Sequence, residues 1–236
     1  MTTKRIKVKV TTKKINIKKI IIALVVLLCL VLSVVYIIHI PVKNIYITGN
    51  KLLKDKEIIS LSNLDNYPPY INTYFMNIKD KLLANDYIEN VKIKRKLPSK
   101  IYLEIKEYKP IAIYNNEIVL SSKKKVKNNL ELDYLPYITN DIENIYDEFV
   151  EGFSKINEDV LLKISHIEYA PNEVDKERFI LYMVDSNYVH ITLSKIEKVN
   201  KYNSIVKELE NQKGIIYLDS GDYLEIKDWH NKKLII

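Results

Sequence analysis

The amino-acid sequence predicts an α+β protein with a single N-terminal transmembrane helix. Three observations support this fold class. Near the N-terminus, 21 consecutive residues carry no formal charge. Beyond them, apolar residues recur at helical spacing in some segments and alternate with charged residues in others, which is typical of amphipathic helices and half-buried strands. Only four glycines occur, and they are expected to mark turns or element boundaries. The order of these patterns predicts a β-α-α-β-β unit followed by a second, β-rich α+β unit.

The uncharged run at residues 20–40 determines the expected topology. As a helix, its 21 residues span about 31 Å, close to the roughly 30 Å of a bilayer's hydrocarbon core. Residues 1–19 contain eight Lys/Arg and no acid, so the positive-inside rule predicts a cytoplasmic N-terminus. A cleaved signal peptide is the alternative. Its apolar region is shorter and ends in small residues, unlike the Tyr-Ile-Ile-His-Ile-Pro sequence found here.

Charge and composition exclude several other classes. Eight of the chain's 37 Lys/Arg precede the apolar run, so 29 remain against 30 Asp/Glu, and the net charge of +7 does not indicate a nucleic-acid partner. Cys29, the one cysteine, lies inside the apolar run, which excludes an intramolecular disulfide and a thiolate metal site. The four histidines lack metal-ligand spacing. We therefore expect no metal, no other cofactor and no small-molecule substrate.

The first unit is expected to contain three strands and two helices. Its last two strands alternate apolar and charged residues on either side of Leu97-Pro98-Ser99, which predicts an antiparallel hairpin with one solvated face. Asn77 is a candidate N-cap for the second helix. The expected elements are strand 42–48, helix 54–61, helix 78–84, strand 91–95 and strand 101–107.

The second unit is expected to be less regular. Residues 123–127 are assigned to a basic turn or loop, and Gly214 follows the last helix at the position of a C-cap. The turn pattern Asp219-Ser220-Gly221-Asp222 predicts a final hairpin. The expected elements are helices at 141–156 and 195–212, and strands at 111–114, 117–120, 164–170, 179–184, 188–193, 215–218 and 223–227.

Several stretches of this sequence resemble the FtsQ/DivIB family of bacterial cell-division proteins. Residues 42–114 are similar throughout, 195–229 in fewer positions, and 115–194 only in general character. One departure is that Glu107 is followed by Tyr108 and Lys109, where the family often has Glu-Arg-x-Pro. The stretches that carry the resemblance are Val42–Asn50, Glu57-Ile58, Asn72–Phe75, Ile88–Ile101, Glu107 with Lys109–Ala112, and Tyr217–Gly221 with Trp229.

The resemblance implies that the first unit is a POTRA domain, a small protein-docking module. It also implies a non-catalytic, single-pass scaffold of the division septum in the cytoplasmic membrane. Such proteins bind small bitopic coiled-coil proteins of the FtsB/DivIC and FtsL types and help recruit and regulate septal cell-wall synthases. The expected division is a basic cytoplasmic tail at 1–19, a transmembrane helix at 20–40, a POTRA-like domain at 41–114, a β-rich domain at 115–229 and a C-terminal tail at 230–236.

The strand at 223–227 is the expected partner-binding element. As the last strand, it is expected to lie at a sheet edge, where unpaired backbone groups accept an added strand. Tyr223 and Trp229 are the candidate anchors, because aromatic residues dominate binding hot spots. The alternative is that both rings cap the core of the second unit. The candidate partner-binding residues are Ser220, Gly221, Tyr223, Leu224, Ile226 and Trp229.

Two residues of the first hairpin, Arg95 and Pro98, form a second candidate surface. Arg95 is expected either to dock a partner or to orient the unit against the membrane, but an ion pair with Glu104 or Glu107 is the favoured interpretation.

A membrane-anchored enzyme acting on the cell wall is the alternative function. It lacks support because no Gly-x-Ser-x-Gly elbow occurs and the second unit shows no polar catalytic constellation.

Overall fold

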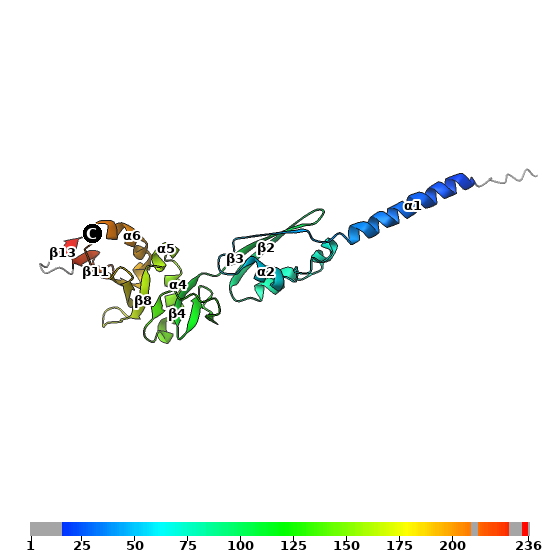
Figure 1. The fold of residues 1–236 in the computed structure, drawn as a ribbon. Helices are drawn as coiled ribbons and strands as arrows, with labels where there is room; N and C mark the ends of the chain where they lie inside the picture. The colour runs from blue at the N-terminus through cyan, green and yellow to red at the C-terminus, as the bar shows by residue number, and fades with distance from the viewer. Residues whose placement is uncertain (1–15, 209–211, 227–232, 236) are drawn as a thin grey trace, which may run out of the picture.

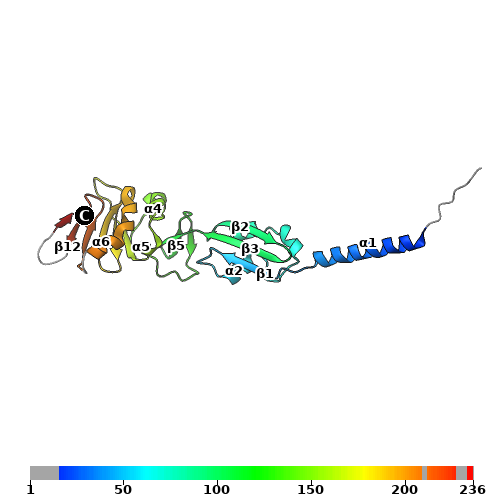
Figure 2. The same cartoon turned by 90° about the horizontal axis from the view of Figure 1, so that it is seen from above.

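The protein is described from a computed structural model that covers residues 16–208, 212–226 and 233–235. The molecule is elongated (Figure 1). A long helix, α1, lies at one end, a unit with a three-stranded sheet follows, and a unit with a ten-stranded sheet lies at the far end (Figures 1 and 2). Most of the expected basic tail, residues 1–15, lies outside the described residues.

Helix α1 (Ile17–Ile38) has 22 residues and buries none of them against the protein. Its length corresponds to about 33 Å, enough to cross a hydrocarbon core of roughly 30 Å. It begins three residues before the expected span and ends two residues earlier. The hydroxyl of Ser33 donates to the carbonyl of Leu30 at 2.7 Å, which satisfies a polar group inside the apolar stretch. The helix therefore fits a single-pass membrane anchor.

The first unit confirms the expected β-α-α-β-β order and adds a short 3-10 helix. Its sheet has the order β1-β3-β2, with β1 parallel and β2 antiparallel to β3. The helices cover one face of this sheet, and the core between them includes fully buried Ile58, Ile78 and Ile101. The elements are β1 (Asn44–Thr48), α2 (Asp55–Leu61), η1 (Tyr70–Tyr74), α3 (Ile78–Leu83), β2 (Ile88–Lys96) and β3 (Lys100–Glu107).

The second unit is built on a single mixed sheet with the strand order β13-β12-β11-β10-β9-β8-β7-β4-β5-β6. Three of its pairs are parallel, β10 with β11, β7 with β8, and β4 with β7. The strands are β4 (Pro110–Tyr114), β5 (Glu117–Leu120), β6 (Lys125–Lys127), β7 (Tyr137–Ile138), β8 (Ile164–Tyr169), β9 (Arg178–Met183), β10 (Tyr188–Thr192), β11 (Gly214–Tyr217), β12 (Tyr223–Ile226) and β13 (Lys233–Ile235).

The helices of this unit pack on one face of the sheet. Phe149 and Phe153 lie 4.2 Å apart by ring centroids, and both contact Phe179 on β9, so three aromatic rings form the centre of the core. The segment between β10 and β11 crosses this face because these parallel strands cannot be joined by a tight turn. The helices are η2 (Glu143–Ile145), α4 (Tyr146–Phe153), α5 (Glu158–Leu161), η3 (Leu193–Lys201) and α6 (Tyr202–Glu208).

Both long helices expected in this unit begin as 3-10 helices instead. In η3 the buried side chains follow at every third position, a spacing that matches the three residues per turn of a 3-10 helix. Among the described residues of the expected ranges 141–156 and 195–212, α-helix is found in α4 and α6. The buried residues at that spacing are Leu193, Ile196, Val199 and Tyr202.

Three further expectations are wrong. Residues 125–127 form strand β6, not a loop, because Val126 packs into a small core between two solvated lysines. Gly214 is the first residue of β11 and does not cap a helix. The expected boundary at residue 114 falls inside the large sheet, since β4 pairs with β5 and β7. We propose that the first domain ends at residue 108 and that β4 belongs to the second.

Candidate partner-binding surface

The candidate binding residues lie on the hairpin formed by β11 and β12. These strands pair antiparallel, with Tyr217 opposite Tyr223 and Ile216 opposite Leu224. Gly214 lies opposite Ile226, and a Cβ at this position would come within 2.4 Å of the Glu225 carbonyl oxygen. Gly214 is therefore required for the close approach of the two strands.

Alternation along β12 sends its side chains to opposite faces of the sheet. Leu224 and Ile226 are buried in the main core, 3% and 7% exposed, so they support the hairpin from inside and offer no side-chain surface to a partner. Tyr223 and Glu225 point to the outer face and are half-buried. Of the expected contact residues on this strand, only Tyr223 thus remains a candidate anchor.

The outer face carries a row of rings that cross the strands. Tyr217 stacks on Tyr223 with centroids 4.5 Å apart, and His190 on β10 contacts Tyr217 edge-on at 4.7 Å. In the neighbouring row, Tyr182 and Tyr188 meet edge-on at 5.2 Å. Sequence analysis did not identify this face because His190 and Tyr217 come from parallel strands 27 residues apart in the numbering. The sequence did contain one signal for this face: in β9, β10 and β11, tyrosines alternate with buried residues and so lie on the side of the sheet opposite the core.

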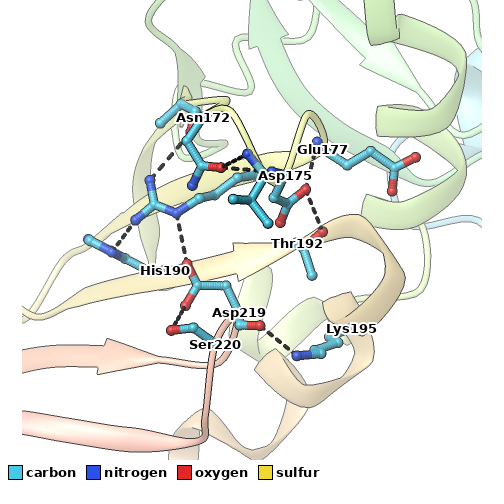
Figure 3. Close-up of polar contacts among 11 residues, drawn as sticks. Asn172, Asp175, Glu177, His190, Thr192, Lys195, Asp219 and Ser220 are labelled. Carbon is cyan, nitrogen blue, oxygen red and sulfur yellow. Dashed lines mark hydrogen bonds and ion pairs between the residues drawn. The ribbon is translucent and has the colours of Figure 1, made fainter.

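The turn after β11 is held in place by an ion pair with Arg178, the first residue of β9 (Figure 3). The Arg178 guanidinium donates from Nε to Asp219 Oδ2 at 2.8 Å and from Nη2 to His190 Nδ1 at 2.5 Å. It also donates to the carbonyl of Ala170 at 3.3 Å. Lys195 Nζ donates to the Asp219 carbonyl oxygen at 2.5 Å. This Arg178 clamp joins β9, β10, η3 and the hairpin turn.

Electrostatics fixes the charge states in the clamp. Burial alone raises the pKa of Asp219, but the hydrogen bonds from Arg178 and Ser220 and the positive charge of Arg178 outweigh it, so the pKa lies below its ordinary value. Burial, assisted by the charge of Arg178, lowers the pKa of His190. A neutral His190 with its proton on Nε2 is required for Nδ1 to accept from Arg178. The centre of the clamp therefore combines the Arg178 cation, the Asp219 anion and the neutral His190 ring.

The remaining turn residues are more accessible. The Ser220 hydroxyl donates to Asp219 Oδ1 at 3.0 Å, and Gly221 has open space around its Cα except for the Tyr223 ring. Asp222, in a left-handed conformation with φ of 50°, pairs with Lys198 at 2.5 Å. Ser220 and Gly221 are thus displayed on a turn that ion pairs fix on both sides.

The expectation that the strand at 223–227 is the sheet edge is wrong. Strand β12 lies between β11 and β13, and Leu224 is paired with Leu234. Among the described residues, β13 is the outermost strand at this end of the sheet. Strand β13 pairs antiparallel with β12, and the sequence at 227–232 contains neither Gly nor Pro to signal a turn. Lys227 and the second candidate anchor, Trp229, lie outside the described residues.

Arg95 and Pro98 lie at the opposite end of the molecule from the hairpin, close to α1. The expected ion pair of Arg95 with Glu104 or Glu107 is not formed: Arg95 donates to the carbonyl oxygen and hydroxyl of Thr73 at 2.7 and 3.2 Å. Arg95 faces the helical side of the sheet, away from Glu104, because the two side chains lie on opposite faces. Pro98 is exposed in the β2–β3 turn, after a cis peptide bond.

Glu107 has a different function from the one expected. Its carboxylate accepts the backbone N–H groups of Lys51 and Leu52 at 2.8 Å and of Leu53 at 3.0 Å. Three donors on one carboxylate fix the loop after Gly49 to the end of β3. Glu104 instead pairs with Lys92 on the solvated face.

Comparison with known proteins shows similarity to bacterial cell-division proteins. Residues 40–108 match the model of the FtsQ-type POTRA domain. The cell-division protein DivIB of Brevibacillus brevis is 27% identical over 211 residues, which cover 83% of this chain and 79% of the relative. DivIB of Bacillus subtilis is 28% identical over 197 residues, covering 78% and 73%. These matches confirm the expected resemblance to the FtsQ/DivIB family of bacterial cell-division proteins.

The three-stranded unit is the POTRA domain, and its match ends at residue 108, two residues before β4 begins at Pro110. The extracytoplasmic domain of DivIB from Geobacillus stearothermophilus, solved as its trans isomer, is 20% identical, with a TM-score of 0.37 over 44% of this chain and 95% of that domain. The similarity to DivIB proteins supports a role in bacterial cell division. Within residues 16–208, 212–226 and 233–235, no group of three His, Cys, Asp or Glu is arranged to hold a metal ion.

Proposed function

We propose that the protein is a non-catalytic, single-pass scaffold of the division septum. In this proposal its far end binds bitopic partners of the FtsB/DivIC and FtsL types and thereby helps to recruit and regulate septal cell-wall synthases. The observation that carries the proposal is the end of the ten-stranded sheet, where β13 is the outermost described strand and lies beside the Tyr217–Tyr223 stack. This end of the molecule is also farthest from α1 (Figures 1 and 2).

A sheet edge of this kind suits an extended partner segment. The outer side of an edge strand presents backbone N–H and C=O groups that pair with an added strand. The affinity of such pairing comes from the backbone, while specificity comes from side chains on both faces. Tyr223 lies one strand inward on the outer face, about 10 Å from the position of a strand added to β13, so a long side chain of the partner contacts its ring across β13. We therefore assign the affinity to the β13 edge and part of the specificity to Tyr223.

The Arg178 clamp supports this assignment because it pre-organises the hairpin. Ordering a loop during binding costs free energy, and a turn that is already fixed avoids this cost. Asp219 is held by Arg178 and Asp222 by Lys198, so the turn between β11 and β12 has one geometry before a partner arrives. Ser220 and Gly221 then present a preformed surface.

The membrane arrangement in the proposal follows from charge. The basic residues of 1–19 favour a cytoplasmic N-terminus, so the two folded units lie outside the cytoplasm. The elongated form places the β13 edge well away from the bilayer (Figure 1). A bitopic partner can reach this edge only with a segment that extends beyond its own membrane helix.

Pull-down of a co-expressed partner pair tests the proposed site. Replacing Tyr223 by Glu places a charge at the anchor and should abolish capture while circular dichroism of the variant stays unchanged. Tyr137, which is 41% exposed on the same face at β7, provides the matched control: Tyr137→Glu should keep full capture. Equal capture by wild type, Tyr223→Glu and Tyr137→Glu, with all three folded, would refute the assignment of Tyr223.

A truncation tests the edge itself. Ending the chain after Ile226 removes β13 and exposes β12. Loss of capture by the folded truncated chain is expected if partners pair with β13, whereas retained capture would rule out β13 as the docking edge.

Incubation of the full chain with peptidoglycan tests the alternative of a wall-acting enzyme, and release of soluble fragments would contradict a non-catalytic scaffold.

A further inference from the structure

The end of the POTRA domain nearest α1 carries an exposed apolar and aromatic surface that the proposed partner site does not use. Phe75 is 81% exposed and Leu97 is 74% exposed, unusually high values for such side chains. Tyr67, Ile71 and Tyr74 are exposed beside them. These five residues, which we call the proximal rim, lie on two segments: the stretch through η1 and the turn between β2 and β3.

Backbone hydrogen bonds place both segments next to the end of α1. The N–H of Tyr70 donates to the carbonyl of Ile40 at 2.7 Å, and the N–H of Lys43 donates to the carbonyl of Ser99 at 3.0 Å. Ile40 is two residues beyond the last residue of α1, Ile38, and two residues of extended chain reach at most about 7 Å. Figures 1 and 2 both show η1 and the β2–β3 turn beside the end of α1.

The rim is held rigidly by Arg95. Its guanidinium bonds to Thr73 through the carbonyl and the hydroxyl, and its Cζ lies 4.9 Å from the centroid of the Tyr74 ring. Thr73 itself is fully buried. Arg95 therefore ties η1 to β2 and keeps Tyr74 and its neighbour Phe75 on the outside of the domain, although no protein group covers the Phe75 ring.

The charge of the same segments is predominantly positive. Residues 40–44, 63–76 and 95–100 contain one acidic residue, Asp65. Aromatic rings together with lysines are the composition of side chains that lie in the interface between lipid and water. Lysine ammonium groups there contact lipid phosphates while their stems stay in the apolar layer. The cationic residues of these segments are Lys43, Arg95, Lys96 and Lys100.

We propose that the proximal rim inserts into the headgroup layer of the membrane that α1 spans and binds anionic phospholipid there. This inference rests on the proposed anchoring through α1. Phe75 and Leu97 enter the boundary of the acyl chains, Tyr67 and Tyr74 lie at headgroup depth, and Lys43, Lys96 and Lys100 contact phosphates. The POTRA domain is then attached to the bilayer at two places, the helix and the rim, and does not swing freely on the short connection at residues 39–43.

Fluorescence quenching in lipid nanodiscs tests the proposal with the full chain. The native Cys29 is replaced by Ser, and an environment-sensitive dye is attached to the chain carrying Phe75→Cys. Lipids with a nitroxide near the headgroup should quench this dye, and aqueous iodide should quench it weakly. Quenching by the nitroxide lipid should be stronger with phosphatidylglycerol present than in pure phosphatidylcholine, and it should weaken at high salt.

Val174→Cys provides the matched control, because Val174 is 96% exposed on the far domain. Its dye should be quenched by iodide and unaffected by the nitroxide lipid. If iodide quenches the dyes at positions 75 and 174 equally and the nitroxide lipid quenches neither, the proposal is overturned. Nitroxide quenching at position 75 that does not depend on anionic lipid would overturn the phospholipid assignment.

A second variant distinguishes lipid contact from a change of fold. With the dye at Tyr67→Cys, the double change Phe75→Ser and Leu97→Ser should reduce nitroxide quenching severalfold while circular dichroism is unchanged. Unchanged quenching in this folded variant would overturn the proposal. The same double variant in detergent should capture the partner pair as wild type does, so failure of the rim proposal and failure of the proposed partner site give different results.

Discussion

At the scale of single residues, Glu107 is the side chain with the clearest structural function. Its carboxylate accepts three backbone N–H groups, from Lys51, Leu52 and Leu53. Hydrogen bonds to a charged acceptor contribute more than neutral ones, and buried donors that lose the acceptor carry a desolvation cost. We expect Glu107→Gln to lower the free energy of unfolding by about 1–2 kcal/mol, measured by urea unfolding of the full chain in detergent.

Glu104 is a suitable control because it lies on the same strand. Its partner is Lys92 at 3.0 Å, and both side chains are exposed to solvent. Exposed pairs of this kind contribute roughly 0–1 kcal/mol. Glu104→Gln should therefore have a smaller effect than Glu107→Gln, and the reverse order would contradict the function assigned to Glu107.

His190 makes the stability of the second domain depend on pH. Its pKa in the folded chain is lowered by burial and by Arg178, so the unfolded chain takes up a proton more readily. Stability should be constant above pH 6.5 and decrease as pH falls below that value, down to the lowered pKa. Asp219, whose pKa is also lowered, stays ionised in this window. Melting temperatures measured between pH 7.5 and pH 5 test this expectation.

The variant His190→Asn separates this effect from general acid sensitivity. The Asn side chain keeps an acceptor for Arg178 but does not titrate between pH 5 and pH 7.5. Its melting temperature should change less than that of wild type over the same range. An identical pH profile for both chains would show that His190 is not the responsible group.

At the scale of secondary-structure elements, Gly214 controls the pairing of β11 with β12. A Cβ at Gly214 would meet the Glu225 carbonyl oxygen at 2.4 Å, and its three nearest atoms are all backbone atoms of β12, so a side-chain movement cannot relieve the contact. At Gly221 the nearest atom is Tyr223 Cδ1 at 3.4 Å, an ordinary contact. We expect Gly214→Ala to destabilise the protein by about 1–3 kcal/mol and Gly221→Ala to change stability by less than about 0.5 kcal/mol.

Hydrogen exchange locates this effect. Amides of β11 and β12 should exchange faster in Gly214→Ala than in wild type, while those of β1, β2 and β3 should be unchanged. Partner capture should fall with the loss of protection if the hairpin is the docking element. Equal protection of the hairpin in both glycine variants would contradict the requirement for glycine at position 214.

Local patterns were sufficient to predict the first domain but not the second. The alternation in β2 and β3 and the Pro98 turn lie within one short stretch, so their pairing needs no distant information. In the second domain, β10 and β11 pair in parallel across 20 residues or more, and the two-residue strand β7 lies between β4 and β8. Such pairings are decided by tertiary packing, and the alternating pattern of short strands does not encode them.

The candidate site shows the same limit. Tyr223 could be identified because it follows a turn signature near the chain end. Its stacking partner Tyr217 is also local, but Arg178 and His190 reach the site only through strand order. Leu224 and Ile226 are buried because they lie on the face of the sheet that the helices cover. The alternation within the four residues of β12 does not show which face that is.

At the scale of the whole molecule, the two domains meet in a packed junction. Tyr87 and Leu130 contact the cores of both domains. On one side Lys124 pairs with Asp86 at 2.6 Å, and on the other Lys51 pairs with Glu158 at 2.6 Å. These contacts fix the orientation of the ten-stranded sheet relative to the POTRA domain. When the proximal rim lies on the membrane, this orientation sets the distance between the β13 edge and the bilayer.

Lys109 lies in the connection between the two domains and anchors the start of β4 to the second domain. Its ammonium donates to the carbonyl oxygens of Ser154 and Ile156, and burial lowers its pKa. Lys109→Met keeps the apolar stem but leaves both carbonyls without this donor, which weakens the connection between β4 and the α4–α5 segment. We expect a broader distribution of distances between spin labels at Asn44 and Val174, measured by pulsed electron paramagnetic resonance. Lys106→Met, which removes an exposed pair with Glu89 inside the POTRA domain, should leave the distribution unchanged. If both variants give the wild-type distribution, the apolar contacts of Tyr87 and Leu130 alone determine the angle between the domains.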